Sequence, residues 1–151
     1  MKTFKQVREE LRAVLAVVPE LNGAPVLVEH AGADIDGEVE RALASGGLVL
    51  VVWTASTAVA DSARGGSVSV RVALPVSIIE NPPVNMQGEG GKRLPLEDAL
   101  QAAIAGVIGK PCGDGEVSLG QEVFARAEAD AGELEVVVGF EAPLVIRARR
   151  A

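Results

Sequence analysis

The clearest hydrophobic pattern in the chain begins at Ser67, where apolar and mostly polar residues start to alternate without a break. The apolar positions are Val68, Val70, Val72, Leu74, Val76 and Ile78. A period of two is typical of a β-strand with one buried face. The pattern ends in Glu80-Asn81-Pro82-Pro83, where two residues without an N–H group must stop the hydrogen-bond ladder. The sequence therefore predicts one long strand that ends at this motif.

Three other stretches repeat apolar residues at intervals of three and four, which predicts amphipathic helices. They cover about 3–18, 35–43 and 96–108. Thr3 is a suitable N-cap for the first helix, and Asp34 or Asp36 for the second. Glycine or proline follows each helix, as is common at helix ends.

Apolar runs predict the remaining strands, at 24–29, 48–55, 121–129 and 133–140, with 144–147 as a continuation or a further strand. The run at 48–55 is apolar at nearly every position, which indicates a strand buried on both faces. Asp130-Ala131-Gly132 predicts a three-residue hairpin connection. We expect a loop at 57–66, which is small, polar and glycine-rich. We expect another at 81–95, which is long for a connection, and such segments are usually either functional or disordered.

The order α-β-α-β-β-α-β-β predicts an α+β fold, in which helices pack on one face of a mostly antiparallel sheet. The strands at 24–29 and 48–55 are linked by a helix, so a parallel βαβ unit is a further expectation at that point. No internal repeat or change of composition divides the chain. We expect one domain over residues 1–151.

Composition indicates an aliphatic core and an acidic surface. Hydrophobic residues make up 48% of the chain but aromatic residues only 3%, and the net charge is −7. Such a chain is poorly suited to bind nucleic-acid phosphates or anionic membranes, or to stack on bases. The charged N-terminus does not resemble a signal peptide, and no apolar run reaches the ~18 residues of a membrane helix. The single cysteine excludes an intrachain disulfide, so we expect a cytosolic protein without a membrane partner.

Few residues are candidates for catalysis. His30 is the only histidine, there is no tyrosine, and no Gly-x-Ser-x-Gly motif is present. Cys112 lies in Lys-Pro-Cys-Gly-Asp-Gly, a predicted turn in which the thiol could be exposed and reactive, but only Lys110 is close in sequence to lower its pKa. The sequence therefore predicts that the protein is not an enzyme.

Two glycine-rich or acidic segments resemble ligand sites only in part. Gly88-Glu-Gly-Gly-Lys-Arg lacks the first glycine of a phosphate-binding loop, because Met86 is at that position, and Arg93 replaces the required Ser or Thr. The acidic residues near His30 have the wrong register for a calcium loop and are typical of a helix N-terminus; they are Glu29, Asp34, Asp36 and Glu38. We expect no cofactor and no metal.

The long strand is large compared with the domain. About thirteen residues at ~3.3 Å each extend ~43 Å, whereas a compact chain of this length is roughly 38 Å across. The strand must therefore bend, with Pro75 as the candidate position, or project beyond the body with its partner. Pro75 also lacks a ladder donor, which predicts an edge or a bulge there. Projecting hairpins commonly bind a partner, often another copy of the chain.

The order of elements resembles that of small phage tail-terminator and tail-completion proteins, with the tail proteins of Mu-like prophages as the nearest likeness. The resemblance is carried by VRVALPVSIIENPPVN, a glycine-rich loop and LPLEDALQAAIAGVIG. In those proteins a strand ending in Glu-Asn-Pro, with a following Asn, leads into such a helix; here these residues are Glu80, Asn81, Pro82 and Asn85. The outline covers most of the chain, but 121–147 cannot be matched residue by residue.

The resemblance implies a structural virion component without catalytic residues. It implies a homo-oligomeric ring, typically a hexamer, that is assembled in the host cytoplasm, caps the tail tube and joins it to head-completion proteins. An acidic lumen would let DNA pass without binding. We expect the interface on the 57–66 and 81–95 loops and the strand between them, with Asp61, Arg64, Arg71, Asn81, Pro82, Pro83, Asn85, Lys92 and Arg93. The alternative is a small-molecule-binding or regulatory α+β domain in which the 81–95 loop is a lid.

Overall fold

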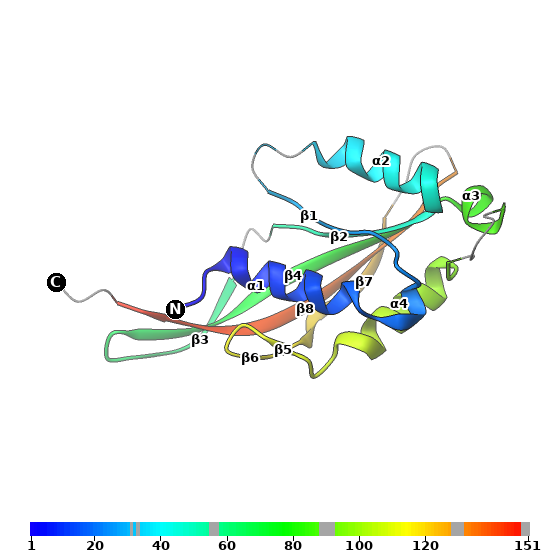
Figure 1. The fold of residues 1–151 in the computed structure, drawn as a ribbon. Coiled ribbons are helices and arrows are strands. Elements are labelled where there is room, and N and C mark those ends of the chain that lie inside the picture. Colours follow the sequence, from blue (N-terminus) through cyan, green and yellow to red (C-terminus); the bar gives the residue numbers. More distant parts are fainter. Residues whose placement is uncertain (31, 33, 55–57, 88–92, 128–131, 149–151) are drawn as a thin grey trace.

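The alternating stretch forms the central strand of a six-stranded sheet. The computed structural model describes residues 1–151 except 31, 33, 55–57, 88–92, 128–131 and 149–151, and only the backbone at 58–64, 87 and 121–127. Strand β4 (Ser67–Glu80) pairs with β8 (Leu134–Arg147) in antiparallel register along its whole length of 14 residues. The strand order is β1-β2-β4-β8-β7, with β3 also paired with β4 (Figure 1).

The other strands are β1 (Val26–Val28), β2 (Leu48–Val52), β3 (Ala58–Arg64) and β7 (Ser118–Ala127), and a separate small hairpin contains β5 (Pro111–Cys112) and β6 (Gly115–Glu116). The helices are α1 (Phe4–Ala16), α2 (Ile35–Gly46), α3 (Pro82–Gln87) and α4 (Leu96–Val107), with a short 3₁₀ helix at Pro19–Leu21. Strands β1 and β2 are parallel and are joined through α2, so the expected βαβ unit is present.

The fold is α+β with a mostly antiparallel sheet, as the sequence predicts, but its helices lie on both faces (Figure 1). Helices α1 and α4 share one buried cluster with Leu48, Leu50 and Val52 of β2. Helix α2 covers the opposite face, where Leu43 shares a second buried cluster with Val49, Val51 and Ile79. The expectation that all helices pack on one face is wrong for α2. Because β2 is apolar at all five positions, it needs cover on both sides.

Local signals in the sequence set the ends of the first two helices. The Gln6 N–H donates to Thr3 Oγ1 at 3.1 Å, and the Thr3 N–H donates to Gln6 Oε1 at 2.8 Å, which makes a capping box at the start of α1. Of the two candidate caps for α2, Asp34 is the one used: its Oδ1 accepts the Gly37 N–H at 3.2 Å. Helix α2 ends at Gly46, and its C-cap Gly47 has a left-handed conformation.

Pro75 marks the place where β4 exchanges one neighbour for another. The Trp53 N–H donates to the Pro75 carbonyl at 2.9 Å, but Pro75 has no N–H to return. Strand β2 ends at Val52, opposite Val76 of β4. On the same edge of β4, β3 pairs with the residues from Val72 back to Ser67. The edge predicted at Pro75 is therefore an interruption on one side only, while pairing with β8 continues through Gly139.

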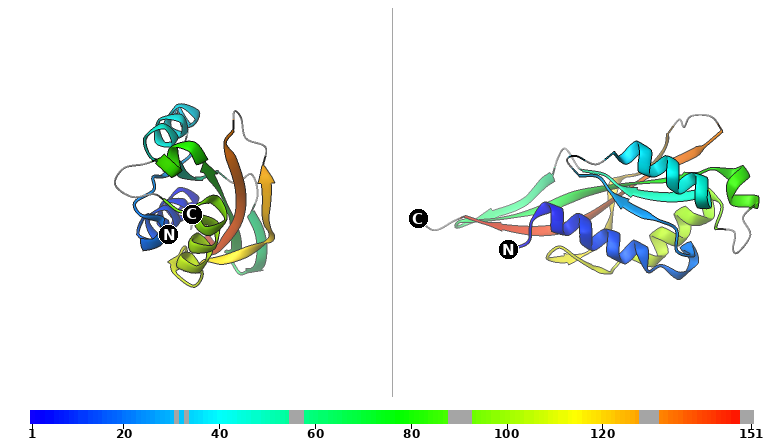
Figure 2. Two further views of the ribbon diagram at one scale, coloured as in Figure 1. Left: turned by 90° about the vertical axis from the view of Figure 1, so that its right-hand side faces the viewer. Right: turned by 45° about the horizontal axis from the view of Figure 1, so that its top comes forward.

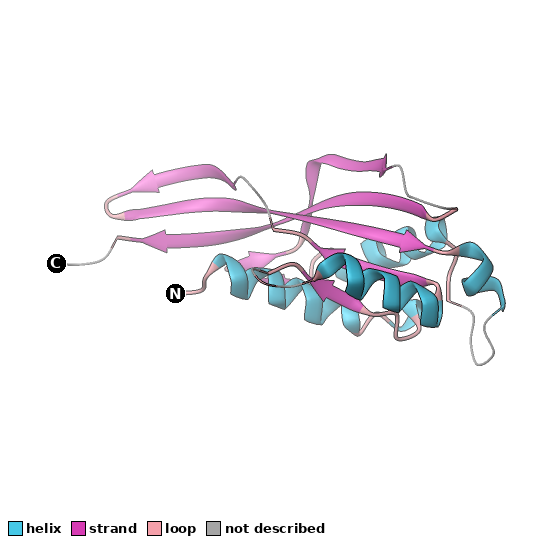
Figure 3. Ribbon diagram, turned by 90° about the horizontal axis from the view of Figure 1, so that it is seen from above, coloured by secondary structure: helices cyan, strands magenta, loops and turns pink. Residues whose placement is uncertain are grey.

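At one end of the sheet β3, β4 and β8 extend past the helices (Figure 3). We call residues 58–72 and 141–147 the arm. Its base, with Val70, Val72, Ala142 and Leu144, lies in the buried cluster that includes Val7 and Leu11 of α1, and its tip projects. This is the projection that the length of β4 predicts. The predicted loop at 57–66 is wrong at 58–64, which form β3, and Gly65-Gly66 make the turn into β4. The small residues of β3 give little periodic signal, whereas the adjacent strand β4 offers a continuous row of backbone partners.

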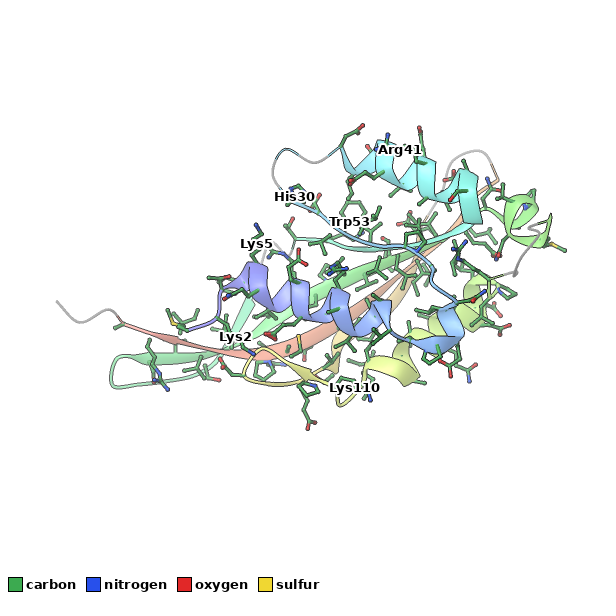
Figure 4. All side chains as sticks on the ribbon, viewed as in Figure 1. Lys2, Lys5, His30, Arg41, Trp53 and Lys110 are labelled. Carbon is green, nitrogen blue, oxygen red and sulfur yellow. The ribbon has the colours of Figure 1, made fainter. Side chains whose placement is uncertain are left out.

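Cys112 is buried, so the exposed thiol that its predicted turn position allows is not present. Cys112 is 1% exposed. Its thiol donates a hydrogen bond to the Val7 carbonyl of α1, with 3.4 Å between Sγ and the oxygen. The Lys2 ammonium group donates to the Gly113 carbonyl at 2.7 Å and so ties the small hairpin to the start of α1 (Figure 4). Burial raises the pKa of the Cys112 thiol to about 11, and the Glu10 carboxylate adds to the rise.

We expect this buried thiol to make stability depend on pH in the alkaline range. The pKa of the thiol is 9.0 in the unfolded chain and about 11 in the folded protein. The stabilisation by the neutral thiol is therefore complete below pH 9.0 and decreases as the pH rises between the two values. Urea unfolding of the wild type and of Cys112→Ala across this range measures the effect. A wild type that loses no more stability than the variant would contradict it.

Candidate functional site

The motif that ends β4 forms a buried polar network, which we call the Glu80–Asn85 network. Glu80 is 5% and Asn85 3% exposed. The Asn85 amide Nδ2 donates to Glu80 Oε2 at 2.8 Å and to the Leu94 carbonyl at 3.0 Å, and Asn85 Oδ1 accepts the Arg93 N–H at 3.0 Å. One side chain thus joins the end of β4 to the residues that lead into α4.

Glu80 supplies the N-terminal cap that α4 does not have in its own sequence. Pro95 precedes the helix and provides no side-chain acceptor. Glu80 Oε1 accepts the Leu96 N–H at 3.1 Å instead. A carboxylate at this end of a helix is favoured both by the unpaired N–H groups and by the helix dipole. Each Glu80 oxygen therefore has a donor, which is the condition for burying a carboxylate.

Residues 82–87 are helical, so the predicted loop over 81–95 is wrong at that point. Pro82 and Pro83 lie in the first turn of α3, where the missing N–H groups need no partner. The Asn81 N–H donates to the Gly47 carbonyl at 2.8 Å. The backbone of α3 approaches so closely that a Cβ at Gly47 would lie 2.5 Å from the Asn85 nitrogen. Gly47 is therefore required both for its positive φ and for its small size.

The residues predicted for an interface are separated by the structure. Asn85 is buried and its polar atoms are used within the network, so the assignment of Asn85 to an interface is wrong. Asn81, Pro82 and Arg93 are half-buried, and Pro83 is exposed. Lys92 lies outside the described residues, as do the side chains of Asp61 and Arg64, whose backbones belong to β3 of the arm.

Arg71 lies on the part of the sheet that α2 leaves uncovered. Its guanidinium NH1 is 3.5 Å from Glu141 Oε1 on β8, and both side chains are partly exposed, so this pair adds little stability. Further along the same face, Ser77 accepts a hydrogen bond from Trp53 Nε1 at 2.7 Å and donates to Glu135 Oε2 at 2.9 Å. Figure 4 shows Trp53 between α2 and the sheet.

Sequence reasoning missed Glu80 and Glu135 as residues with specific partners. A signal for Glu80 was present, because it occupies the next position of the apolar face of the alternating strand. A carboxylate placed on a buried face requires donors. No comparable signal marks Glu135, because its partner Ser77 is 58 residues away in the chain.

Two of the acidic residues around His30, Glu29 and Asp34, have structural roles. The Thr54 N–H donates to Glu29 Oε1 at 3.1 Å and the Thr54 hydroxyl donates to the same atom, and these bonds lower the pKa of Glu29. Asp34 caps α2. Within the part of the chain that the structure describes, no group of three or more His, Cys, Asp or Glu residues is placed to hold a metal ion. Residues 88–92 of the glycine-rich segment lie outside the described residues.

A hollow of about 450 Å³ opens beside the start of α4. It has aliphatic side chains and several carboxylates, and is lined by Glu80, Pro95, Leu96, Glu97, Asp98, Leu100, Leu134, Glu135 and Val136. Smaller hollows lie along α4, near Gly106, and at the tip of the arm, near Gly66. Among the described residues that line the hollow at α4 there is no Ser, Cys, His or Lys, so its chemistry suits the binding of a positively charged or aliphatic group.

Comparisons with known proteins add no family to this description. No model of a known protein family matches the chain, and no curated protein matches it. Among the described residues, none of the helices has both the length and the apolar character needed to cross a membrane.

We expect Glu80→Ala to lower the free energy of unfolding by about 3 kcal/mol, because it removes the acceptor of both the Asn85 amide and the Leu96 N–H. The matched control is Glu97→Ala at the exposed first turn of the same helix, which should cost under about 0.5 kcal/mol. Chemical denaturation measures both values. Similar losses in the two variants would show that the network does not hold α4.

Gly47→Ala should destabilise the protein more than Gly23→Ala, although both glycines have a positive φ. Open space surrounds the position that an added methyl group would take at Gly23, so its variant bears only the backbone strain of about 1 kcal/mol. At Gly47 the backbone of α3 must also shift, which should bring the loss to at least about 2 kcal/mol. Equal unfolding midpoints for the two variants would exclude the close approach as a constraint.

Proposed function

We propose that this chain is a structural subunit of a phage or phage-derived tail, where copies form a ring at the end of the tail tube and join it to the head-completion proteins. The observation that carries the proposal is the projecting arm (Figure 3). Its tip holds paired strands beyond the helix-covered core, and the described pairing of β3 is with β4 alone. An extended strand with an unpaired edge is a surface that commonly binds another chain.

The chemistry of the described side chains supports a structural role. The thiol of Cys112 is buried and its pKa is raised, so it is a poor nucleophile. The Glu80 carboxylate caps α4, Glu29 binds Thr54, and Asp34 caps α2. In this proposal the protein is not an enzyme, it needs no cofactor, and it is located in the virion tail after assembly in the host cytoplasm.

The acidic character of the chain is consistent with a passage for DNA. With a net charge of −7, a ring of several copies would carry a strongly negative inner surface if its acidic side faced the lumen. Such a surface repels phosphates, so DNA would pass without specific binding.

The alternative of a small-molecule-binding or regulatory domain has less support. A lid over the sheet needs a segment that can open. The Asn85 side chain instead bonds to Arg93 and Leu94 beyond the segment 88–92, and its own backbone belongs to α3 before that segment. Both flanks of the proposed lid are therefore anchored to the end of β4.

The ring proposal is tested by the mass and shape of the protein in solution and on tail tubes. We expect sedimentation velocity to show species of several copies that increase with concentration, and electron microscopy to show rings, free or at one end of purified tail tubes. Genes for tail-tube, tape-measure or head-completion proteins should lie beside this gene. A protein that stays monomeric at all concentrations and does not bind tubes, encoded away from such genes, would contradict the proposal.

A further inference from the structure

Formal charge is divided unequally along the molecule. The arm and the residues after it, 58–72 and 141–151, contain five arginines and two acidic residues, which gives a formal charge of +3. Because the whole chain has a net charge of −7, the rest of it carries −10. The arginines at the end of this segment are Arg147, Arg149 and Arg150. The protein therefore has a basic projecting end and an acidic body.

The hollow beside α4 is an acidic site with an aliphatic floor. Glu97 and Asp98 on its rim are exposed and have no ion-pair partner among the described residues. Glu135 uses one carboxylate oxygen for Ser77. The aliphatic lining residues are Leu96, Leu100, Leu134 and Val136. Carboxylates above an aliphatic floor suit an arginine, whose stem is apolar and whose head is charged.

The arginines cannot reach the hollow of their own chain. Glu80 and Leu134, which line the hollow, pair with each other at one end of the β4–β8 ladder, and Ser67 pairs with Arg147 at the other end. The 14-residue strand separates these ends by about 43 Å. Three further residues from Arg147 to Arg150 add at most about 11 Å. Figure 2 shows the end of β8 and helix α3 at opposite ends of the molecule.

We propose that the basic end of one arm binds the acidic hollow beside α4 of a second copy. This contact rests on the proposed ring and names the surfaces that build it. Arg147, Arg149 and Arg150 pair with the carboxylates on the rim, while their stems cover the aliphatic floor. Because two different surfaces meet, each copy uses both of them, and the contact repeats from copy to copy until the assembly closes.

The test uses two charge-reversed proteins. One carries Glu97→Lys and Asp98→Lys in the hollow, and the other carries Arg149→Glu and Arg150→Glu in the arm. Each alone should associate at least about tenfold more weakly than the wild type, since like charges then meet at every contact. An equal mixture should recover assembly, because every hollow then finds an arm of opposite charge. Sedimentation velocity measures the association, and circular dichroism verifies folding.

A matched control carries Asp36→Lys and Glu40→Lys on the exposed surface of α2. It changes the net charge by the same amount as the Glu97→Lys and Asp98→Lys protein but leaves the hollow intact. Its association should equal that of the wild type. If both reversed proteins assemble normally, or if their mixture fails to recover, the proposed contact is wrong while the ring proposal stands. A wild type that does not assemble at all, alone or on tail tubes, overturns both proposals.

Discussion

The antiparallel pairing of β4 with β8 is the interaction on which the rest of the structure depends. It continues over the full 14 residues of both strands although each contains a proline. The Pro75 carbonyl accepts a bond from Trp53 and the Pro143 carbonyl one from Asp114, so both prolines face away from this ladder and their missing donors do not interrupt it. The other strands and the helices pack around the two-stranded ladder, and its free end becomes the arm.

At the other end of the ladder, the Glu80–Asn85 network connects the end of β4 to the start of α4 by hydrogen bonds. Pro82 and Pro83 stop the strand, and Pro95, which precedes α4, gives that helix no side-chain cap. The buried Glu80 carboxylate satisfies that helix from the strand, and Asn85 satisfies the carboxylate. The motif of Glu80, Asn81, Pro82 and Asn85, on which the resemblance to tail proteins is based, thus has a structural role that does not depend on any partner. In the proposed assembly the partner therefore binds at the arm and at the hollow beside α4.

The proposed assembly joins these two ends. A basic arm and an acidic hollow about 43 Å apart on one chain cannot bind each other within that chain, but they can do so between copies. A head-to-tail contact of this kind leads to a ring when the rotation between copies closes. In this proposal the remaining acidic surface is available to line the lumen.

The sequence by itself determined the elements whose signals are local. Alternation from Val68 to Ile78 specified β4, the capping residues Thr3 and Asp34 specified the starts of α1 and α2, and the prolines specified the end of the strand. Tertiary structure decided what depends on distant partners. Strand β3 has a weak pattern and forms through its pairing with β4. The pattern predicts that β2 is covered on both faces, but only the fold decides that α2 covers the second one. The pattern also places Glu80 on the buried face, but only the fold gives this carboxylate the Asn85 amide and the Leu96 N–H as partners. Such partners are set by packing, which period and propensity along the chain do not encode.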